Sequence, residues 1–205
     1  MSAFMAEKLA KAPYRQTSLM PSPDDRELAE RLARGDAWAR EALYRKYVQA
    51  VWGLALRLTG NRSDAEDVVQ DTFAEALRDA AQLRDRGAVR AWLMGVAVHQ
   101  VHRRFRRRRL LRVLGLDRGA DASLDELAAR DTPQDVLAEL HTISRELRGL
   151  PPKPRIAWTL RFVEGCSLAE VAAYCDCSLA TAKRQIAAAQ RRIAHHVSVE
   201  EPADD

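Results

Sequence analysis

The chain of 205 residues is poor in cysteine, in aromatic residues and in glycine-rich segments. Its three cysteines form no even disulfide framework, which favours a reducing cytoplasm over an oxidising compartment. No apolar run at the amino end has the length of a signal peptide, and no later segment is long enough to span a membrane. A Gly-rich phosphate loop and a nucleophile–base arrangement are also missing, so the sequence favours neither an enzyme nor a cofactor.

The apolar residues that are present have the spacing of helices. They make up 47% of the chain, which is enough for real cores. Leu43, Tyr47, Val51, Leu54 and Leu58 recur every three or four positions. No segment shows the sustained alternation of a strand, so the predicted fold class is all-α.

A change of composition divides the chain into two small helical domains. The segment GLDRGADASLDELAARDT is net acidic, rich in Asp, Ala and Gly, and has little apolar periodicity, as expected of a flexible linker. The predicted organisation is a disordered tail at 1–21, a first domain at 22–112, the linker at 113–132, a second domain at 133–197 and an acidic tail at 198–205.

The stretch SLAEVAAYCDCSLATAKRQIAAAQRRI has the layout of a helix-turn-helix DNA reader. Ser167 and Glu170 predict a capping box at the start of a short helix. Asp176 suits a left-handed residue in the turn, and Ser178 is placed to cap the second helix. That helix offers DNA a set of polar and basic candidates, namely Ser178, Thr181, Lys183, Arg184, Gln185 and Arg191.

Two cysteines, Cys175 and Cys177, fall in the turn of this helix pair. With His195 and His196 downstream, they do not have the spacing of a zinc site. We interpret them as small buried residues and expect no metal.

A run of arginines surrounds Phe105 on one predicted helix. On a helix this density covers most of the circumference, so the run cannot all belong to an ordinary solvated face. Neutralisation of phosphates is the natural use, and a solubilising or membrane-surface patch is the alternative. The run comprises Arg103, Arg104, Arg106, Arg107, Arg108, Arg109 and Arg112.

An acidic face is predicted on the helix that begins with a capping box of Ser63 and Glu66. A row of carboxylates in a basic domain repels DNA and suggests a basic protein partner. A solvated face that complements the helix N-terminus explains the spacing equally well. The face consists of Asp64, Asp67, Gln70 and Asp71, and the core side of the same helix of Ala65, Val68, Val69, Phe73 and Leu77.

These features, in this order, resemble the extracytoplasmic-function sigma factors of bacterial RNA polymerase over about residues 25–197. The resemblance is carried by DDRELAERLARGDAWAREALYRKY, SDAEDVVQDTFAEAL, VRAWLMGVAVHQVHRRFRRRR and LRGLPPKPRIAWTLRFVEGCSLAEVAAYCDCSLATAKRQIAAAQRRI. It implies a sigma region 2 domain and a region 4 domain. It also implies a factor that binds core polymerase, recognises the minus-ten and minus-thirty-five promoter elements and promotes DNA opening, while the polymerase makes the RNA.

The resemblance implies roles for individual residues as well. Asp64, Asp67, Gln70 and Asp71 would bind the basic coiled coil of the β′ clamp, with Phe73 as core support. A loop at 82–91 would capture an unstacked minus-ten base, and Trp92 would pack beneath it. Together with the helix at 92–109, this loop would contact DNA through Arg84, Arg86, Arg90, His99, Arg103, Arg104, Arg106 and Arg107.

The resemblance further implies that the helix-turn-helix reads the minus-thirty-five element and that the β flap is a second polymerase contact. Many members are held by an anti-sigma factor, which would be another partner. Three positions depart from the usual pattern: His99 replaces an asparagine, and Gln185 and Ala188 replace residues that are commonly basic.

Two other functions remain open on the sequence. A helix-turn-helix repressor or activator that never engages polymerase would leave the SDAEDVVQDTF helix unexplained. An adaptor that docks on polymerase without starting transcription would bind the core enzyme but form no open complex.

Overall fold

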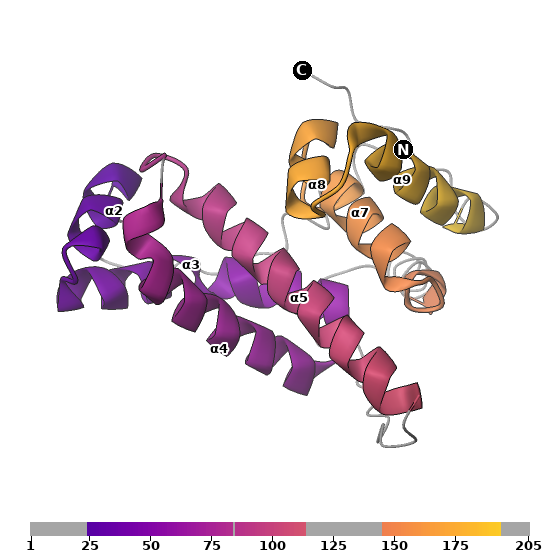
Figure 1. Ribbon diagram of the computed structural model, residues 1–205, viewed down its shortest axis with the longest axis horizontal. Coiled ribbons are helices and arrows are strands. Elements are labelled where there is room, and N and C mark those ends of the chain that lie inside the picture. The colour runs from indigo at the N-terminus through magenta and orange to yellow at the C-terminus, as the bar shows by residue number, and fades with distance from the viewer. Residues whose placement is uncertain (1–23, 84, 114–144, 194–205) are drawn as a thin grey trace, which may run out of the picture. The chain divides into compact units, whose positions relative to one another are not determined.

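The computed structural model describes residues 24–83, 85–113 and 145–193. Within this part every regular element is a helix (Figure 1), which confirms the all-α prediction. The described helices form an amino-terminal unit at 24–113 and a carboxy-terminal unit at 145–193. Outside the described residues lie both predicted tails, the linker at 114–132, the start of the second domain, and Arg84, His195 and His196.

The amino-terminal unit is built on three long helices. α3 packs against both α4 and α5, these two pack on each other, and α2 lies on α3. A short 3-10 helix, η1, contacts α2 and α4. The elements are α2 (Asp25–Ala33), α3 (Ala37–Thr59), α4 (Arg62–Asp79), η1 (Ala80–Gln82) and α5 (Val89–Val113).

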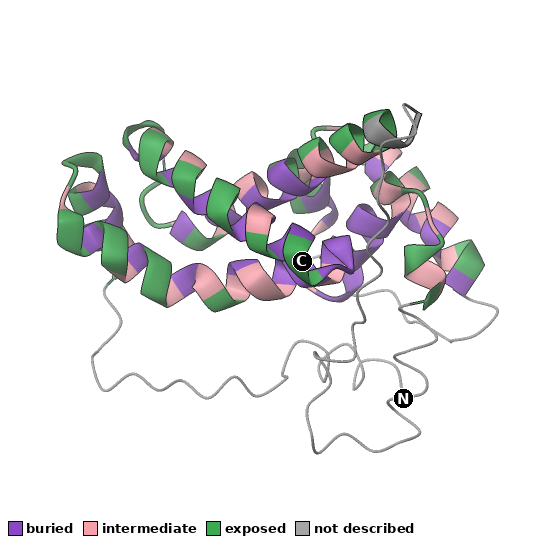
Figure 2. Cartoon of the chain, turned by 90° about the horizontal axis from the view of Figure 1, so that it is seen from below, coloured by how far each residue is buried: buried purple, intermediate pink, exposed green. Residues whose placement is uncertain are grey.

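The core of this unit follows the predicted apolar spacing. Figure 2 shows buried residues in purple along the sides of the helices that face one another. The five residues predicted on α3 are all buried, as are Ala65, Val68, Val69 and Phe73 of α4. The prediction for Leu77 was wrong, because its side chain is 40% exposed. Ala76 takes the core position in that turn, which keeps the apolar stripe in register with Phe73 and Ala80.

Turn residues define where these helices begin and end. Asp36 caps α3 by accepting a hydrogen bond from the amide of Trp38 (2.8 Å). Gly60 ends α3 in the left-handed conformation with φ of 66°. The cap of α4 is Asn61, whose side chain accepts from the amide of Asp64 at 2.9 Å. The prediction of Ser63 as this cap was therefore wrong, because Asn61 is an equally good capping residue that stands next to the turn.

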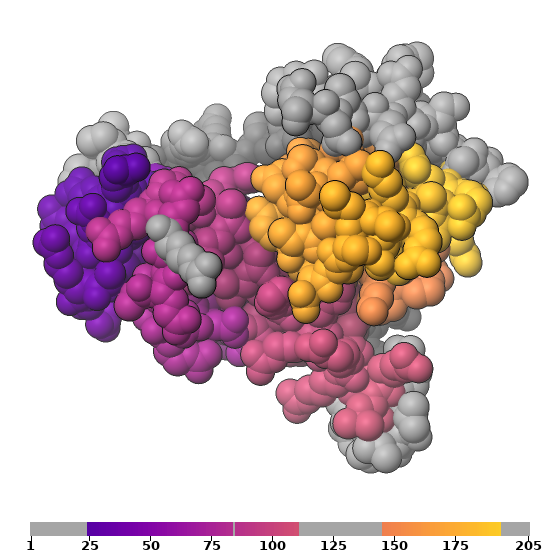
Figure 3. Space-filling model, turned by 45° about the horizontal axis from the view of Figure 1, so that its top comes forward, coloured from indigo at the N-terminus to yellow at the C-terminus, as the bar shows by residue number. Residues whose placement is uncertain are grey.

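The carboxy-terminal unit is a compact set of three helices, preceded by a helical turn at 145–148. Each of the three contacts the other two. In the space-filling view, they form one continuous surface coloured orange to yellow (Figure 3). They are α7 (Pro152–Phe162), α8 (Leu168–Tyr174) and α9 (Leu179–Ile193).

The predicted helix-turn-helix geometry is present in α8 and α9. Ser167 and Glu170 form the reciprocal capping box of α8. Asp176 has φ of 49°, so the turn does use a left-handed aspartate. The hydroxyl of Ser178 accepts from the amide of Thr181 at 3.2 Å and so caps α9. The buried side of α9 is Ala182, Ile186, Ala189 and Ile193.

Candidate functional site

The acidic face of α4 is only partly a surface. Gln70 and Asp71 are exposed, and Asp67 is half-exposed. Asp64 is different, because its side chain is only 4% exposed and points toward α5. Three of the four predicted residues are thus open to a partner, whereas Asp64 lies within the unit.

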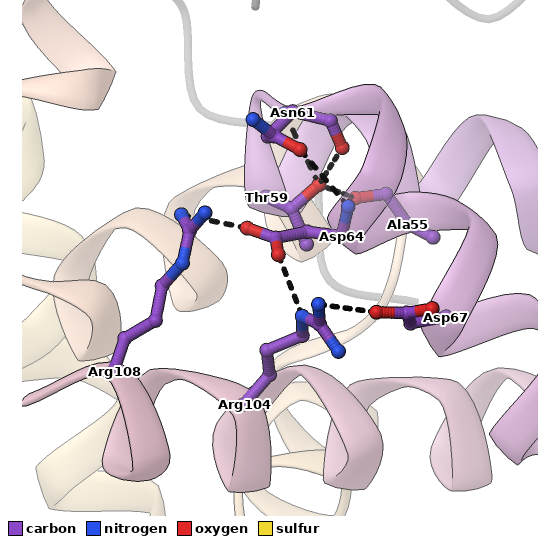
Figure 4. Close-up of polar contacts among 7 residues, drawn as sticks. All are labelled: Ala55, Thr59, Asn61, Asp64, Asp67, Arg104 and Arg108. Carbon is purple, nitrogen blue, oxygen red and sulfur yellow. Dashed lines mark hydrogen bonds and ion pairs between the residues drawn. The ribbon is translucent and has the colours of Figure 1, made fainter. Parts of the chain in front are cut away.

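Asp64 is held by two arginines of α5, as Figure 4 shows. Arg104 donates through Nε to Oδ1 of Asp64 at 2.6 Å, and Nη1 of Arg108 lies 2.6 Å from Oδ2. Nη2 of Arg104 also pairs with the carboxylate of Asp67. Burial by itself would lower the pKa of the Arg104 guanidinium, but the hydrogen bonds and charges of Asp64 and Asp67 outweigh burial and raise that pKa.

The polar turn before α4 fixes Asp64 from the other side. The buried hydroxyl of Thr59 donates to the carbonyl of Ala55 (2.8 Å) and accepts from the amide of Asn61 (3.3 Å). The side chain of Asn61 then accepts from the amide of Asp64. Asp64 therefore stands at a well-ordered point in the first turn of α4, where a carboxylate also complements the helix dipole.

The arginine run divides by helix face. Arg104 and Arg108 are one turn apart and both face α4. Arg103 is exposed, and its Nη1 lies 3.4 Å from the carboxylate of Glu75. Between residues 99 and 109, the side chains that α5 turns outward are His99, Arg103, Arg106, Arg107 and Arg109. The sequence alone did not separate these two faces.

The basic segment before α5 is shorter than predicted. Arg90 was assigned to a loop, but α5 begins at Val89, so Arg90 lies in its first turn and is exposed. Arg86 is also exposed, and its Nη1 lies 3.3 Å from Oε1 of Glu30 on α2. The side chain of Asp85 accepts from the amide of Gly87 at 2.9 Å and shapes the turn. Trp92 is half-buried in the first turn of α5.

The outward side of α9 carries the predicted DNA-reading residues. Ser178, Lys183, Arg184 and Arg191 are exposed, and Thr181 and Gln185 are half-buried. The hydroxyls of Ser178 and Thr181 lie 3.0 Å apart. Nη2 of Arg184 donates to Oγ1 of Thr181 at 3.2 Å, so this guanidinium is ordered near the N-terminus of the helix. Such a helix end is what enters the major groove in this motif.

The cysteines are less buried than expected. Cys166, Cys175 and Cys177 are free thiols of intermediate exposure, so the prediction that Cys175 and Cys177 are buried was wrong. Partial burial still raises the pKa of Cys175 to about 12, with a smaller contribution from Cys177. Among the residues that the structure describes, no cluster of His, Cys, Asp and Glu is arranged to hold a metal ion. The same described helices include none that is long and apolar enough to cross a membrane.

Sequence reasoning missed several residues of this site. Arg108 was not assigned a role beyond the run, yet it pairs with Asp64. Its spacing of one turn from Arg104 was the available signal, because residues four apart share a helix face. Asn61 also had a local signal, because it is a good N-cap residue next to the turn. Glu30, which pairs with Arg86, had none, since its role depends on a contact between elements.

Comparisons with known proteins agree with this arrangement. The family described as Sigma-70 region 2 matches residues 43–110, which lie within the amino-terminal unit. The family described as Sigma-70, region 4 matches residues 140–193 and so includes all three helices of the carboxy-terminal unit.

Curated relatives match over most of their length. The ECF RNA polymerase sigma-E factor of Haemophilus influenzae is 31% identical over 180 residues, which cover 84% of this chain and 95% of the relative. The RNA polymerase sigma-H factor of Pseudomonas aeruginosa is 29% identical over 182 residues, or 85% of this chain and 94% of the relative.

A solved structure shares the fold. It is the sigma factor RpoE of Bartonella quintana, crystallised with the anti-sigma factor NepR. It is 24% identical, with a TM-score of 0.61 over 74% of this chain and 92% of that one. The two family matches and the relative of 31% identity show that the chain belongs to the extracytoplasmic-function (ECF) sigma factors, the promoter-recognising transcription initiation factors of bacterial RNA polymerase.

Proposed function

We propose that this sigma factor binds core RNA polymerase through the exposed part of its acidic face, Asp67, Gln70 and Asp71 of α4. The observation that carries this proposal is a separation of charge within one unit. Carboxylates gather on the outer side of α4, while the outward side of α5 is basic. A basic coiled coil on the polymerase clamp complements the first surface and is repelled by the second.

The basic side of the same unit is proposed to hold the minus-ten element. The proposal places DNA contacts on the turn and α5, that is, on Arg86, Arg90, His99, Arg103, Arg106 and Arg107, with Arg84 as a further expected contact. Arg104 has its guanidinium engaged by Asp64 and Asp67, so we remove it from the phosphate-binding set. Asp64 is likewise reassigned from polymerase contact to support of the face.

Opening DNA requires a base to leave the stack, which costs a few kcal/mol. Phosphate contacts and a pocket for the extruded base must offset this cost. The exposed arginines of α5 supply the phosphate contacts, and each neutralised phosphate adds to the salt dependence of binding. The turn at 85–88, tied to α2 by the Arg86–Glu30 ion pair, is proposed to lie beside the extruded base.

The carboxy-terminal unit is proposed to read the minus-thirty-five element in the major groove, next to the β flap. Its contacts would be Ser178, Thr181, Lys183, Arg184, Gln185 and Arg191. The domain boundaries 22–112 and 133–197, with a linker at 113–132 between them, are part of the same proposal. Its place of action is the cytoplasm, where the polymerase works.

The test is initiation by σ-free core polymerase on sheared genomic DNA, with and without this protein. Discrete new RNA start sites that share two upstream motifs support the proposal. Core binding without new starts would favour the adaptor instead. If the protein neither produces new start sites nor binds core polymerase, it is better described as a DNA-binding regulator that does not bind polymerase.

A charge reversal tests the acidic face itself. Asp71→Lys is expected to abolish core binding, because it places a cation against a basic partner. Glu27→Lys is the matched control, since Glu27 is also an exposed helix carboxylate but lies on α2. Equal loss of binding in the two variants would refute the assignment to α4.

A further inference from the structure

Two arginines of the run have a role that the function above does not use. Arg104 and Arg108 face α4 and hold the carboxylate of Asp64 between them (Figure 4). A buried carboxylate is costly unless cations or donors compensate it. Asp64 has such compensation, because the guanidiniums of Arg104 and Arg108 each hold one of its carboxylate oxygens, and the Asn61 cap fixes its backbone amide. Asp64 is thus a fixed anchor for whatever binds it.

Of the two arginines, Arg104 also contacts a second carboxylate, that of Asp67. The fork of Arg104 spans two carboxylates, with Nε on Asp64 and Nη2 on Oδ2 of Asp67. Arg108 contacts Asp64 but not Asp67 in this cluster. The side chain of Asp67 is 46% exposed, so it can meet a partner while Arg104 holds one of its oxygens.

We propose that Arg104 is a positioning residue of the polymerase-binding face, which uses Asp64 as an anchor to hold Asp67 in the orientation that a basic polymerase segment requires. This inference rests on the proposed function, in which Asp67 contacts polymerase. It assigns Arg104 to polymerase binding, although Arg104 belongs to the helix that carries the DNA-binding arginines.

Two opposing effects decide what removing Arg104 does. Loss of its positive charge makes the face more attractive to a basic partner, but interactions between solvent-exposed charges contribute little. Loss of the fork frees Asp67, which must then be ordered again on binding. We therefore expect ordering to dominate and core affinity to fall about 3- to 10-fold.

The experiment measures the affinity of the full-length protein for σ-free core polymerase. Arg104→Gln and Arg104→Lys are both expected to weaken binding by about 3- to 10-fold, since lysine keeps the charge but lacks the fork. Arg108→Gln is the matched control: it removes the same charge from the same helix and from the same carboxylate. It is expected to change core affinity less than about 2-fold.

A double-mutant cycle separates positioning from general loss of structure. In an Asp67→Asn background, Arg104→Gln is expected to add nothing to the loss of core binding. Thermal unfolding of each variant shows whether it folds. If Arg104→Gln does not fold, Arg104→Lys replaces it in the cycle, because lysine keeps a cation beside Asp64. A full additional loss in the Asp67→Asn background would overturn the inference.

Three further results would also overturn it. The first is that Arg104→Gln binds core as tightly as the unmodified protein, and the second is that Arg104→Lys does so. The third is that Arg104→Gln lowers the salt dependence of promoter binding by the holoenzyme as much as Arg106→Gln does, which would indicate a phosphate contact. If Asp67→Asn itself leaves core binding unchanged, the proposed polymerase contact fails first, and this outcome is distinct from the other three.

Discussion

Nη1 of Arg108 lies 2.6 Å from Oδ2 of Asp64, which joins the C-terminal half of α5 to the first turn of α4. The carboxylate of this pair is almost completely shielded from solvent, because the Asp64 side chain is 4% exposed. We predict that Asp64→Asn lowers the free energy of unfolding by about 3 kcal/mol, since Arg108 loses its carboxylate partner and Arg104 loses one of its two in a partly buried place. Urea unfolding measures this change.

The control for that experiment is Asp71→Asn on the same helix. Asp71 is exposed, so this change is expected to stay within about 0.5 kcal/mol. Equal destabilisation by the two variants would contradict a structural role for Asp64.

Asp176 adopts a left-handed backbone conformation, with φ of 49°, in the turn between α8 and α9. A residue with a Cβ but without the short polar side chain of Asp is strained there. Asp176→Ala is therefore expected to destabilise the carboxy-terminal unit by about 1 kcal/mol, whereas Asp176→Gly is tolerated. Thermal melting of both variants checks the prediction, and an alanine variant as stable as the glycine variant would refute it.

Cys175 predicts a pH dependence at alkaline pH. Burial raises the pKa of its thiol from 9.0 to about 12, so the folded state keeps a proton that the unfolded state loses. The resulting stability is complete below about pH 9 and is lost as pH rises toward 12. The melting temperature should therefore fall between pH 9 and 11, and fall less steeply in Cys175→Ala.

Thiol labelling offers an independent measurement of Cys175. At pH 8 its thiolate is scarce, so alkylation in the folded protein should be much slower than in urea. Fast labelling of Cys175 under native conditions would show that the thiol is not shielded.

Arg184 is held toward the N-terminus of α9 by Thr181 at 3.2 Å. We predict that Arg184→Ala reduces discrimination at one minus-thirty-five base pair by about 1–3 kcal/mol, as loss of a base contact does. Arg191→Ala, which lies near the other end of α9, should weaken binding evenly across sequences. Initiation from promoters with single minus-thirty-five substitutions distinguishes the two patterns, and an even loss in Arg184→Ala would contradict base reading.

Local signals allowed much of this fold to be predicted. The apolar stripe of α3 and the capping box at Ser167 depend on residues within a few turns of each other, and both were correct. The prediction that Leu77 is buried was wrong because Leu77 lies on the edge of the apolar stripe, where either Ala76 or Leu77 fits a helical period. Only packing between helices decides which of the two turns inward.

The candidate site was harder to predict, for the same reason. The spacing of Asp64, Asp67 and Asp71 indicated one acidic face but not that its first member is buried. That outcome depends on Arg104, which is 40 residues away in the chain. The density of the arginine run likewise concealed its two faces, because a continuous run has no period from which a buried side can be read.

The shortness of α8, at seven residues, limits how its function can be transferred. A helix of this length is unstable in isolation and keeps its shape through its neighbours and its capping box. Grafting α8 and α9 alone onto another protein is therefore not expected to transfer DNA recognition. We expect that promoter preference can be exchanged between relatives only when α7, α8 and α9 are exchanged together.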